Sequence, residues 1–193
     1  MTSPVGNAGA LSLGPGWLSW APLGTPLPGD LTTPLIEAYE RIGYTEEGSE
    51  FSYEVSADAV EVAESLDPIM YKTTGRNGTL SFAMAENTVR NLTLSFNGGL
   101  VERMADGSIK YSPPEPGTEV RRVIVFESED GQERWVFPQV FQGGTVSMAR
   151  RKGADKVTLP VEFRLEKPAL GGPPFFPFYA DERDGGSGVA PIV

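Results

Sequence analysis

Alternating apolar and polar residues mark three segments of the chain, 51–59, 79–85 and 157–165. Successive side chains of a β-strand point to opposite faces of the sheet, so this pattern is typical of strands with one buried face. Two further segments, 119–127 and 132–141, are rich in Val, Ile, Phe and Trp, which favour strands. The sequence therefore predicts a mainly β protein.

Dipeptides typical of tight turns lie between these segments, namely Asn77-Gly78, Asp106-Gly107 and Asp130-Gly131. Asn-Gly and Asp-Gly favour the short turns that join antiparallel strands. Because Asp130-Gly131 lies between two predicted strands, we expect a hairpin there. The alternation of 51–59 loses its phase near Asp58–Val60, which indicates a turn or a β-bulge.

One helix is expected at 87–96, with Asn87 as its N-cap and Asn97-Gly98-Gly99 as its end. Its apolar face would consist of Val89, Leu92 and Phe96, which recur at helical spacing. A single short helix among many strands predicts either an α+β fold or an all-β fold with one added helix.

Glycine and proline are frequent at both ends, making up twelve of residues 1–36 and ten of residues 168–193. Proline lacks a backbone donor and glycine raises the entropic cost of order, so regular structure is not expected there. We expect arms over 1–36 and 169–193 flanking a domain over 37–168. The ends also carry aromatic residues that a solvated linker would not need, which suggests docking on the chain's own core or on a neighbouring subunit: Trp17, Trp20, Phe175, Phe176 and Phe178.

The formal net charge of −10 is concentrated in one block. Residues 37–67 hold ten acids and one base, whereas residues 101–168 hold eleven of each. A nucleic-acid-binding surface would have the opposite sign. The basic run Arg150-Arg151-Lys152 is either a solvated turn or a contact with an acidic face of a neighbour.

Alternation within the acidic block assigns its residues to two faces. The apolar face, expected to pack into the core, comprises Phe51, Tyr53, Val55 and Ala57. The opposite face must meet water. Its acids, with those that follow along the chain, are Glu50, Glu54, Asp58, Glu61 and Glu64.

The composition excludes several kinds of chemistry. The chain has no cysteine and no histidine, so disulfides, thiol catalysis and histidine-based triads are impossible. Carboxylate pairs such as Glu61 with Glu64 could in principle hydrolyse sugars or bind calcium, but repulsion and solvation explain a dense acidic run equally well. No phosphate-binding loop occurs, and no apolar run approaches the ~20 residues of a membrane span. We expect no catalysis, no cofactor and no metal.

The order of several short motifs resembles the tail tube (major tail) proteins of long-tailed, siphophage-type phages that infect actinobacteria. Glu37-Ala38-Tyr39-Glu40-Arg41-Ile42-Gly43-Tyr44, followed by Gly48 and Phe51, is similar to the opening of that family. The later motifs, which continue the resemblance to about residue 167, are the segments 60–68, 79–82, 86–89, 96–99 and 159–163.

The resemblance implies a two-sheet β-sandwich or barrel with one flanking helix, whose inner sheet joins a multi-subunit β-barrel in a hexameric ring. Such rings stack into a tube that conducts double-stranded DNA into the host. Implied partners are further copies of the chain and the tape measure, distal tail and terminator proteins. The implied location is the tail of a virion assembled in the bacterial cytoplasm. On this basis Glu54 and Asp58 are expected to face the lumen, and Glu50, Glu61 and Glu64 are further candidates. The alternative is a solvated outer face.

Two alternatives stay open. A related tube or terminator component of a phage-like particle would have the same fold. A monomeric β-sandwich that binds carbohydrate would instead expose tryptophans as a platform, although Trp17 and Trp20 lie in an irregular end and Trp135 in an alternating segment.

Overall fold

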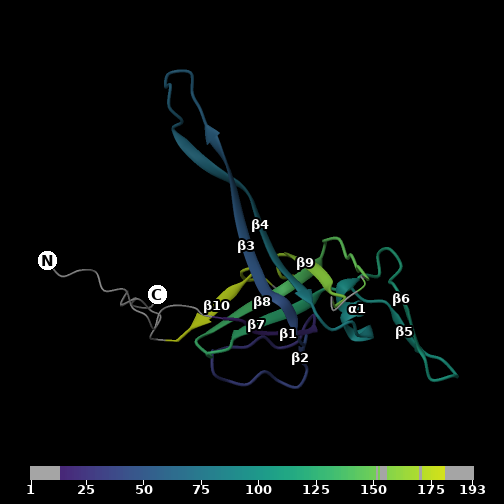
Figure 1. Cartoon of the computed structure of the whole chain (residues 1–193). Coiled ribbons are helices and arrows are strands. Elements are labelled where there is room, and N and C mark those ends of the chain that lie inside the picture. Colours follow the sequence, from purple (N-terminus) through teal and green to yellow (C-terminus); the bar gives the residue numbers. More distant parts are fainter. Residues whose placement is uncertain (1–13, 151, 153–155, 170, 181–193) are drawn as a thin grey trace. The chain divides into compact units, whose positions relative to one another are not determined.

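The computed structural model describes residues 14–150, 152, 156–169 and 171–180 (Figure 1). The chain divides into two compact units. The first comprises the described parts of Met1–Gly43, Arg121–Gln139 and Lys167–Val193, and the second comprises those of Tyr44–Val120 and Val140–Glu166.

The first unit contains the strands β1 (Gly16–Pro22), β2 (Glu40–Arg41), β7 (Arg122–Ser128) and β10 (Phe176–Tyr179), and most of β8 (Glu133–Gln142). The strands follow the order β2-β1-β7-β8, and β10 pairs with β8. The pairs β1–β2, β1–β7 and β8–β10 are antiparallel.

The buried cluster of this unit consists of Ala21, Val123, Val125 and Val136. The loop residues Leu35 and Tyr39 pack against it together with Phe176 and Phe178. Burial raises the pKa of the Tyr39 phenol to about 12, because the charged form would lose its hydration. The segment between β1 and β2 therefore folds back onto the sheet despite its proline content.

The strand β1 corrects our expectation that residues 1–36 lack regular structure. Glycine begins this strand and proline ends it, and the five residues between them form a ladder with β7. Leu18, Trp20 and Ala21 are buried. Residues 1–13 lie outside the described part of the chain.

The predicted hairpin at Asp130-Gly131 is confirmed and joins β7 to β8. The hydroxyl oxygen of Ser128 accepts hydrogen bonds from the backbone N–H groups of Gln132 and Glu133 at 3.1 and 3.0 Å. Gly131 has a φ of 68°, a conformation that glycine adopts without steric cost.

The second unit contains β3 (Thr45–Val60), β4 (Met70–Met84), β9 (Leu159–Leu165) and the last residues of β8 in the order β8-β9-β4-β3. All of these neighbouring pairs are antiparallel. A separate two-stranded sheet is formed by β5 (Leu100–Arg103) and β6 (Ile109–Ser112), whose turn contains the predicted Asp106-Gly107.

Apolar side chains of β4 and β9 form most of the core of the second unit. The rings of Phe82 and Phe163 stack with centroids 5.7 Å apart. The other buried apolar residues of this unit include Leu80, Met84, Leu94, Leu159 and Val161.

The one helix of the described chain, α1 (Val89–Ser95), is shorter than expected. Thr88 is its N-cap in place of Asn87, because the Thr88 hydroxyl accepts a hydrogen bond from the backbone N–H of Asn91 at 3.2 Å. Its buried face is also displaced from the predicted one. The buried residues are Asn91, Leu94 and Ser95, whereas Val89, Leu92 and Phe96 are only partly buried.

The predicted turn at Asn77-Gly78 is wrong, since both residues lie inside β4. A Cβ at Gly78 would lie 3.0 Å from the side chain of Leu165 and 3.1 Å from that of Tyr53. Glycine therefore allows neighbouring strands to pack closely here. The predicted irregularity near Asp58 occurs as a register shift between Ser56 and Ala57.

The mainly β class with one short helix is thus confirmed, and the two sheets are consistent with a β-sandwich fold. The five strong strand predictions correspond to β3, β4, β7, β8 and β9. The strands β1, β2, β5, β6 and β10 were not predicted.

Candidate assembly surface

One face of β3 carries a row of acids. Glu50, Glu54 and Asp58 are spaced four residues apart along β3. Because side chains of a strand alternate between its two faces, these three point to the same side. Their register partners on β4 are Ser81, Asn77 and Lys72. The register shift between Ser56 and Ala57 places its extra residue on β4, so the alternation of side chains along β3 from Glu50 to Asp58 is preserved. All three acids are exposed, which leaves an anionic row open to water.

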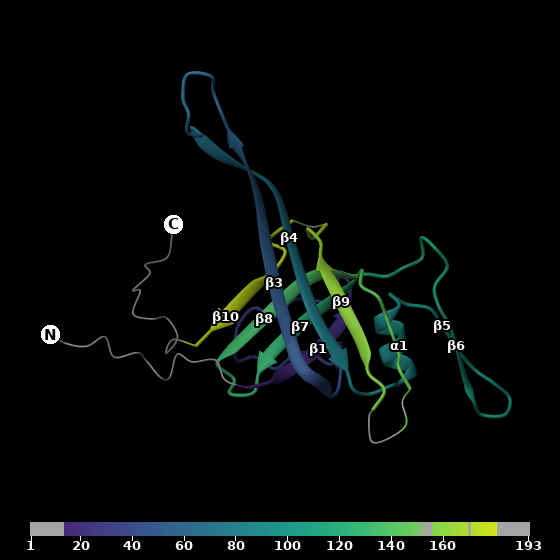
Figure 2. The same cartoon turned by 45° about the horizontal axis from the view of Figure 1, so that its top comes forward.

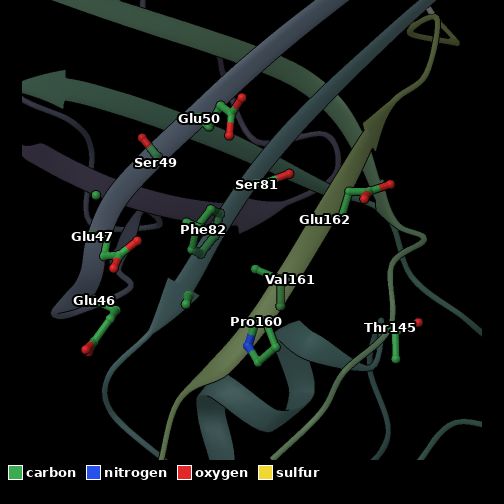
Figure 3. Close-up of a pocket in the computed structure, with 12 residues that line it drawn as sticks. Glu46, Glu47, Ser49, Glu50, Ser81, Phe82, Thr145, Pro160, Val161 and Glu162 are labelled. Carbon is green, nitrogen blue, oxygen red and sulfur yellow. The ribbon is translucent and has the colours of Figure 1, made fainter.

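A shallow acidic pocket of about 450 Å³ lies at the start of this row (Figure 3). Its carboxylates belong to Glu46, Glu47, Glu50 and Glu162. Ser81 and Phe82 lie between them in the view of Figure 3. The pocket therefore continues the acidic surface from β3 across β4 to β9.

Glu162 is an acid of this surface that our sequence analysis did not select. It is the register partner of Ser81, which also pairs with Glu50 on the other side. Its carboxylate lies 3.5 Å from the guanidinium of Arg164. The available signal was its polar position in the alternating segment 157–165, but the register that places it beside Glu50 could not be inferred from sequence.

The outer part of the β3–β4 hairpin has no further strand beside it among the described residues. The ladder between β4 and β9 covers only Thr79–Met84 of β4. Beyond it, Tyr53–Val60 and Met70–Gly78 pair only with each other. Figures 1 and 2 both show this hairpin extending past β9.

The apolar face of the outer hairpin is exposed. Phe51 and Tyr53 are half-buried, as the expected core packing requires, and their rings lie 6.4 Å apart. Val55 and Ala57 are exposed instead, with 52% of Val55 accessible. Tyr71, from β4, is 70% exposed. The expectation that Val55 and Ala57 pack into the core is therefore wrong, because no layer of the described residues buries this part of the hairpin.

The turn of the hairpin holds the last two predicted acids, Glu61 and Glu64. They do not belong to the strand row, since β3 ends at Val60. Exposed apolar residues surround them, namely Val62, Leu66, Ile69 and Met70. We call residues 61–69 the hairpin tip.

The aromatic residues predicted to dock lie in the first unit, in different environments. Trp20 is buried under the guanidinium of Arg122, which lies 4.5 Å from its ring centroid. Trp17 stays 40% exposed, with Arg41 4.9 Å above its ring. These two side chains occupy opposite faces of β1.

The C-terminal aromatic residues dock on the chain itself. Phe175 stacks on Trp135 with centroids 5.9 Å apart. Phe176 and Phe178 contact each other edge-on at 5.6 Å and pack against the valine cluster of the first unit. Residues 181–193 of the predicted extension lie outside the described chain.

Within the described residues, no group of three or more acidic, histidine or cysteine side chains is arranged to hold a metal ion. None of the helices in that part of the chain is long and apolar enough to cross a membrane. The features that stand out are an acidic sheet face, an exposed apolar hairpin and free strand edges. These features indicate a class of protein, namely a β protein whose surfaces are suited to assembly.

The comparison with protein families identifies that class more closely. The family described as "Phage tail tube protein" matches residues 7–180, which is most of the chain. The chain therefore belongs to the phage tail tube protein family and is a structural component of a phage-type tail. Membership of a structural family indicates a non-enzymatic protein.

Among solved structures, the chain is similar to a protein in "Cryo-EM structure of the anti-feeding prophage (AFP) baseplate, 6-fold symmetrised". The sequence identity is 13% and the TM-score is 0.46, over 94% of this chain and 99% of the other. No curated protein matches the chain.

Proposed function

We propose that the chain forms hexameric rings that stack into the tail tube of a long-tailed phage infecting actinobacteria. The tube would conduct double-stranded DNA into the host during ejection. Assembly would take place in the host cytoplasm, with tape measure, distal tail and terminator proteins as partners. The role is structural and needs no cofactor.

The observation that carries this proposal is the outer β3–β4 hairpin. Unpaired strand edges and an exposed apolar face promote association with further strands. Burying a large apolar side chain contributes about 1.5–3 kcal/mol, so Val55 and Tyr71 favour contacts between subunits. Closing several sheets into one barrel pairs all of their edges, which turns this liability into an interface.

The acidic row of β3 supports the assignment of a lumen. Glu50, Glu54 and Asp58 would recur around each ring and along the stack. An anionic wall repels DNA phosphates, so the genome would slide through without binding. Glu162 would extend this wall onto β9.

Negative-stain electron microscopy of the concentrated protein tests the assembly. We expect rings or tubes with six-fold symmetry in end views. A monodisperse monomer under the same conditions, measured by light scattering, would contradict the proposal and favour a monomeric binding module.

The lumen is tested by the double variant Glu54→Lys with Asp58→Lys in an assembling phage. We expect tubes to form and DNA ejection to slow or stall, because the wall becomes cationic. Glu37→Lys with Glu115→Lys makes the same change in net charge at exposed residues outside β3 and should leave ejection unchanged. A tube structure with Glu54 and Asp58 on the outer wall would refute the lumen assignment.

A further inference from the structure

The hairpin tip is an ordered turn that exposes apolar side chains. The backbone N–H of Ile69 donates to the carbonyl of Val60 at 3.0 Å, and that of Ser65 donates to Val62 at 3.3 Å. The hydroxyl of Ser65 donates to the carbonyl of Asp67 at 2.9 Å. Although the backbone is held in this way, the apolar side chains Val62, Leu66 and Ile69 remain exposed. An ordered apolar tip indicates a surface for docking.

The charge of the tip restricts what can dock there. Glu61, Glu64 and Asp67 are exposed, and no base occurs from residue 61 to residue 69. A partner must therefore combine apolar contact with positive charge, since bringing like charges together is unfavourable.

The chain presents such a surface on the segment between β8 and β9. Met148, Arg150 and Lys152 are exposed there, and we call these three residues the basic patch. No described residue pairs with Arg150 or Lys152. The patch therefore places two basic side chains close to an apolar one along the chain.

The basic patch and the hairpin tip belong to opposite ends of the β3–β4 pair. The segment that carries the patch is attached near the start of β3, because Gly143 donates to the carbonyl of Glu162 at 2.9 Å and Lys156 pairs with Glu46 at 2.5 Å. The tip follows the far end of β3, after Val60. From Glu50 to the tip the strand extends roughly 35 Å at about 3.3 Å per residue. A subunit's own tip is therefore too far away to reach its own patch.

We propose that the hairpin tip of one copy docks on the basic patch of a second copy. This inference rests on the proposed function, and it names the residues that join one copy to the next along the tube. Each copy offers both an acidic tip and a basic patch, so the contact is head-to-tail and extends into a filament. Leu66 and Ile69 lose water against the second copy beside Met148, while opposite charges accelerate and orient the encounter.

Charge reversal on either side tests the contact in the full chain. The tip variant is E61K/E64K/D67K and the patch variant is R150E/K152E. We expect each alone to raise the critical protein concentration for tube assembly by about tenfold or more, because facing charges become alike. Assembly is followed by light scattering and electron microscopy, and folding of each variant by circular dichroism.

Mixing the two variants gives the decisive result. In an equimolar mixture, every reversed tip can meet a reversed patch and every native tip a native patch. We therefore expect the mixture to restore the wild-type critical concentration. The variant E37K/E115K/E129K changes net charge as much as the tip variant at exposed residues outside both surfaces, and it should assemble normally.

Separate outcomes overturn the inference and the proposed function. Wild-type protein that stays monomeric refutes the proposed function, and the inference with it. Tubes from the wild type and from both variants at the same concentration refute the inference alone, as does a mixture of folded variants that fails to assemble. If a variant does not fold, the salt dependence of wild-type assembly tests the inference instead. Raising NaCl from about 0.05 to about 0.5 M should raise the critical concentration of the wild type, because salt screens the attraction between tip and patch. An unchanged critical concentration overturns the inference.

Discussion

The strands β1 and β3 show opposite relations between sequence pattern and burial. The alternation in β3 is regular, yet Val55 and Ala57 on its apolar face are exposed in the outer hairpin. The strand β1 lies in a segment rich in glycine and proline, yet Leu18, Trp20 and Ala21 are buried. The difference lies in their neighbours: β1 has a strand on each side, whereas the outer part of β3 pairs only with β4.

Alternation thus predicts a strand without revealing what covers its apolar face. In a protein that assembles, the cover can be another copy of the chain. Glycine and proline likewise limit where a strand begins and ends, here at Gly16 and Pro22, without excluding the strand between them. Removing residues 1–24 would therefore remove β1, which lies between β2 and β7 in the sheet, in contrast to our expectation that residues 1–36 lack regular structure.

The largest effect is expected for Trp20→Ala in β1. Trp20 is 8% exposed, so its removal should lower the free energy of unfolding by about 3–5 kcal/mol. Urea denaturation at a protein concentration below assembly measures this change. Trp17→Ala is the matched control on the opposite face and should cost about 1–2 kcal/mol, since Trp17 is 40% exposed. Equal effects would contradict the contrast between the two faces.

A second comparison concerns two leucines of α1. Leu94 is buried and Leu92 is half-buried, so Leu94→Ala should cost about 2–5 kcal/mol and Leu92→Ala about 1 kcal/mol. The same denaturation experiment measures both. A larger loss for Leu92→Ala would restore the helix face that the sequence predicts and refute the observed one.

Much of the fold was predictable because local patterns determine it. Five strands and the Asp130-Gly131 hairpin followed from alternation, composition and turn dipeptides. The position of the helix was predicted, but its buried face differs from the predicted one. Asn91 and Ser95 are buried because their side chains form hydrogen bonds. The Asn91 amide donates to the carbonyl of Glu86 at 2.8 Å, and the Ser95 hydroxyl to the carbonyl of Asn91 at 2.8 Å. Hydropathy assigns such residues to the surface.

The candidate surface was only partly predictable, for reasons of register. Alternation alone placed Glu54 and Asp58 on one face of β3 and left Glu50 as a further candidate. The proximity of Glu50 to Glu162 depends on the pairing of β3 with β4 and of β4 with β9, which are non-local contacts. The misplaced turn at Asn77-Gly78 has the same cause, because the close approach of Leu165 and Tyr53 explains this glycine better than a local turn does.

The smallest effect on the subunit is expected for Val55→Thr in the outer hairpin. Threonine keeps the branched shape that favours strands, and 52% of Val55 is already exposed to water. The free energy of unfolding of the monomer should therefore change by less than about 0.5 kcal/mol. Assembly should respond differently, because a hydroxyl group would lose its hydration wherever a second copy covers this face. We expect a higher critical concentration for tube formation, measured by light scattering beside the denaturation curve of the same preparation.

Val125→Thr, at a residue buried within the first unit, is the opposite control and should destabilise the monomer itself. If Val55→Thr destabilises the monomer as much as Val125→Thr, the apolar face of β3 is covered by its own chain and the contrast with β1 fails.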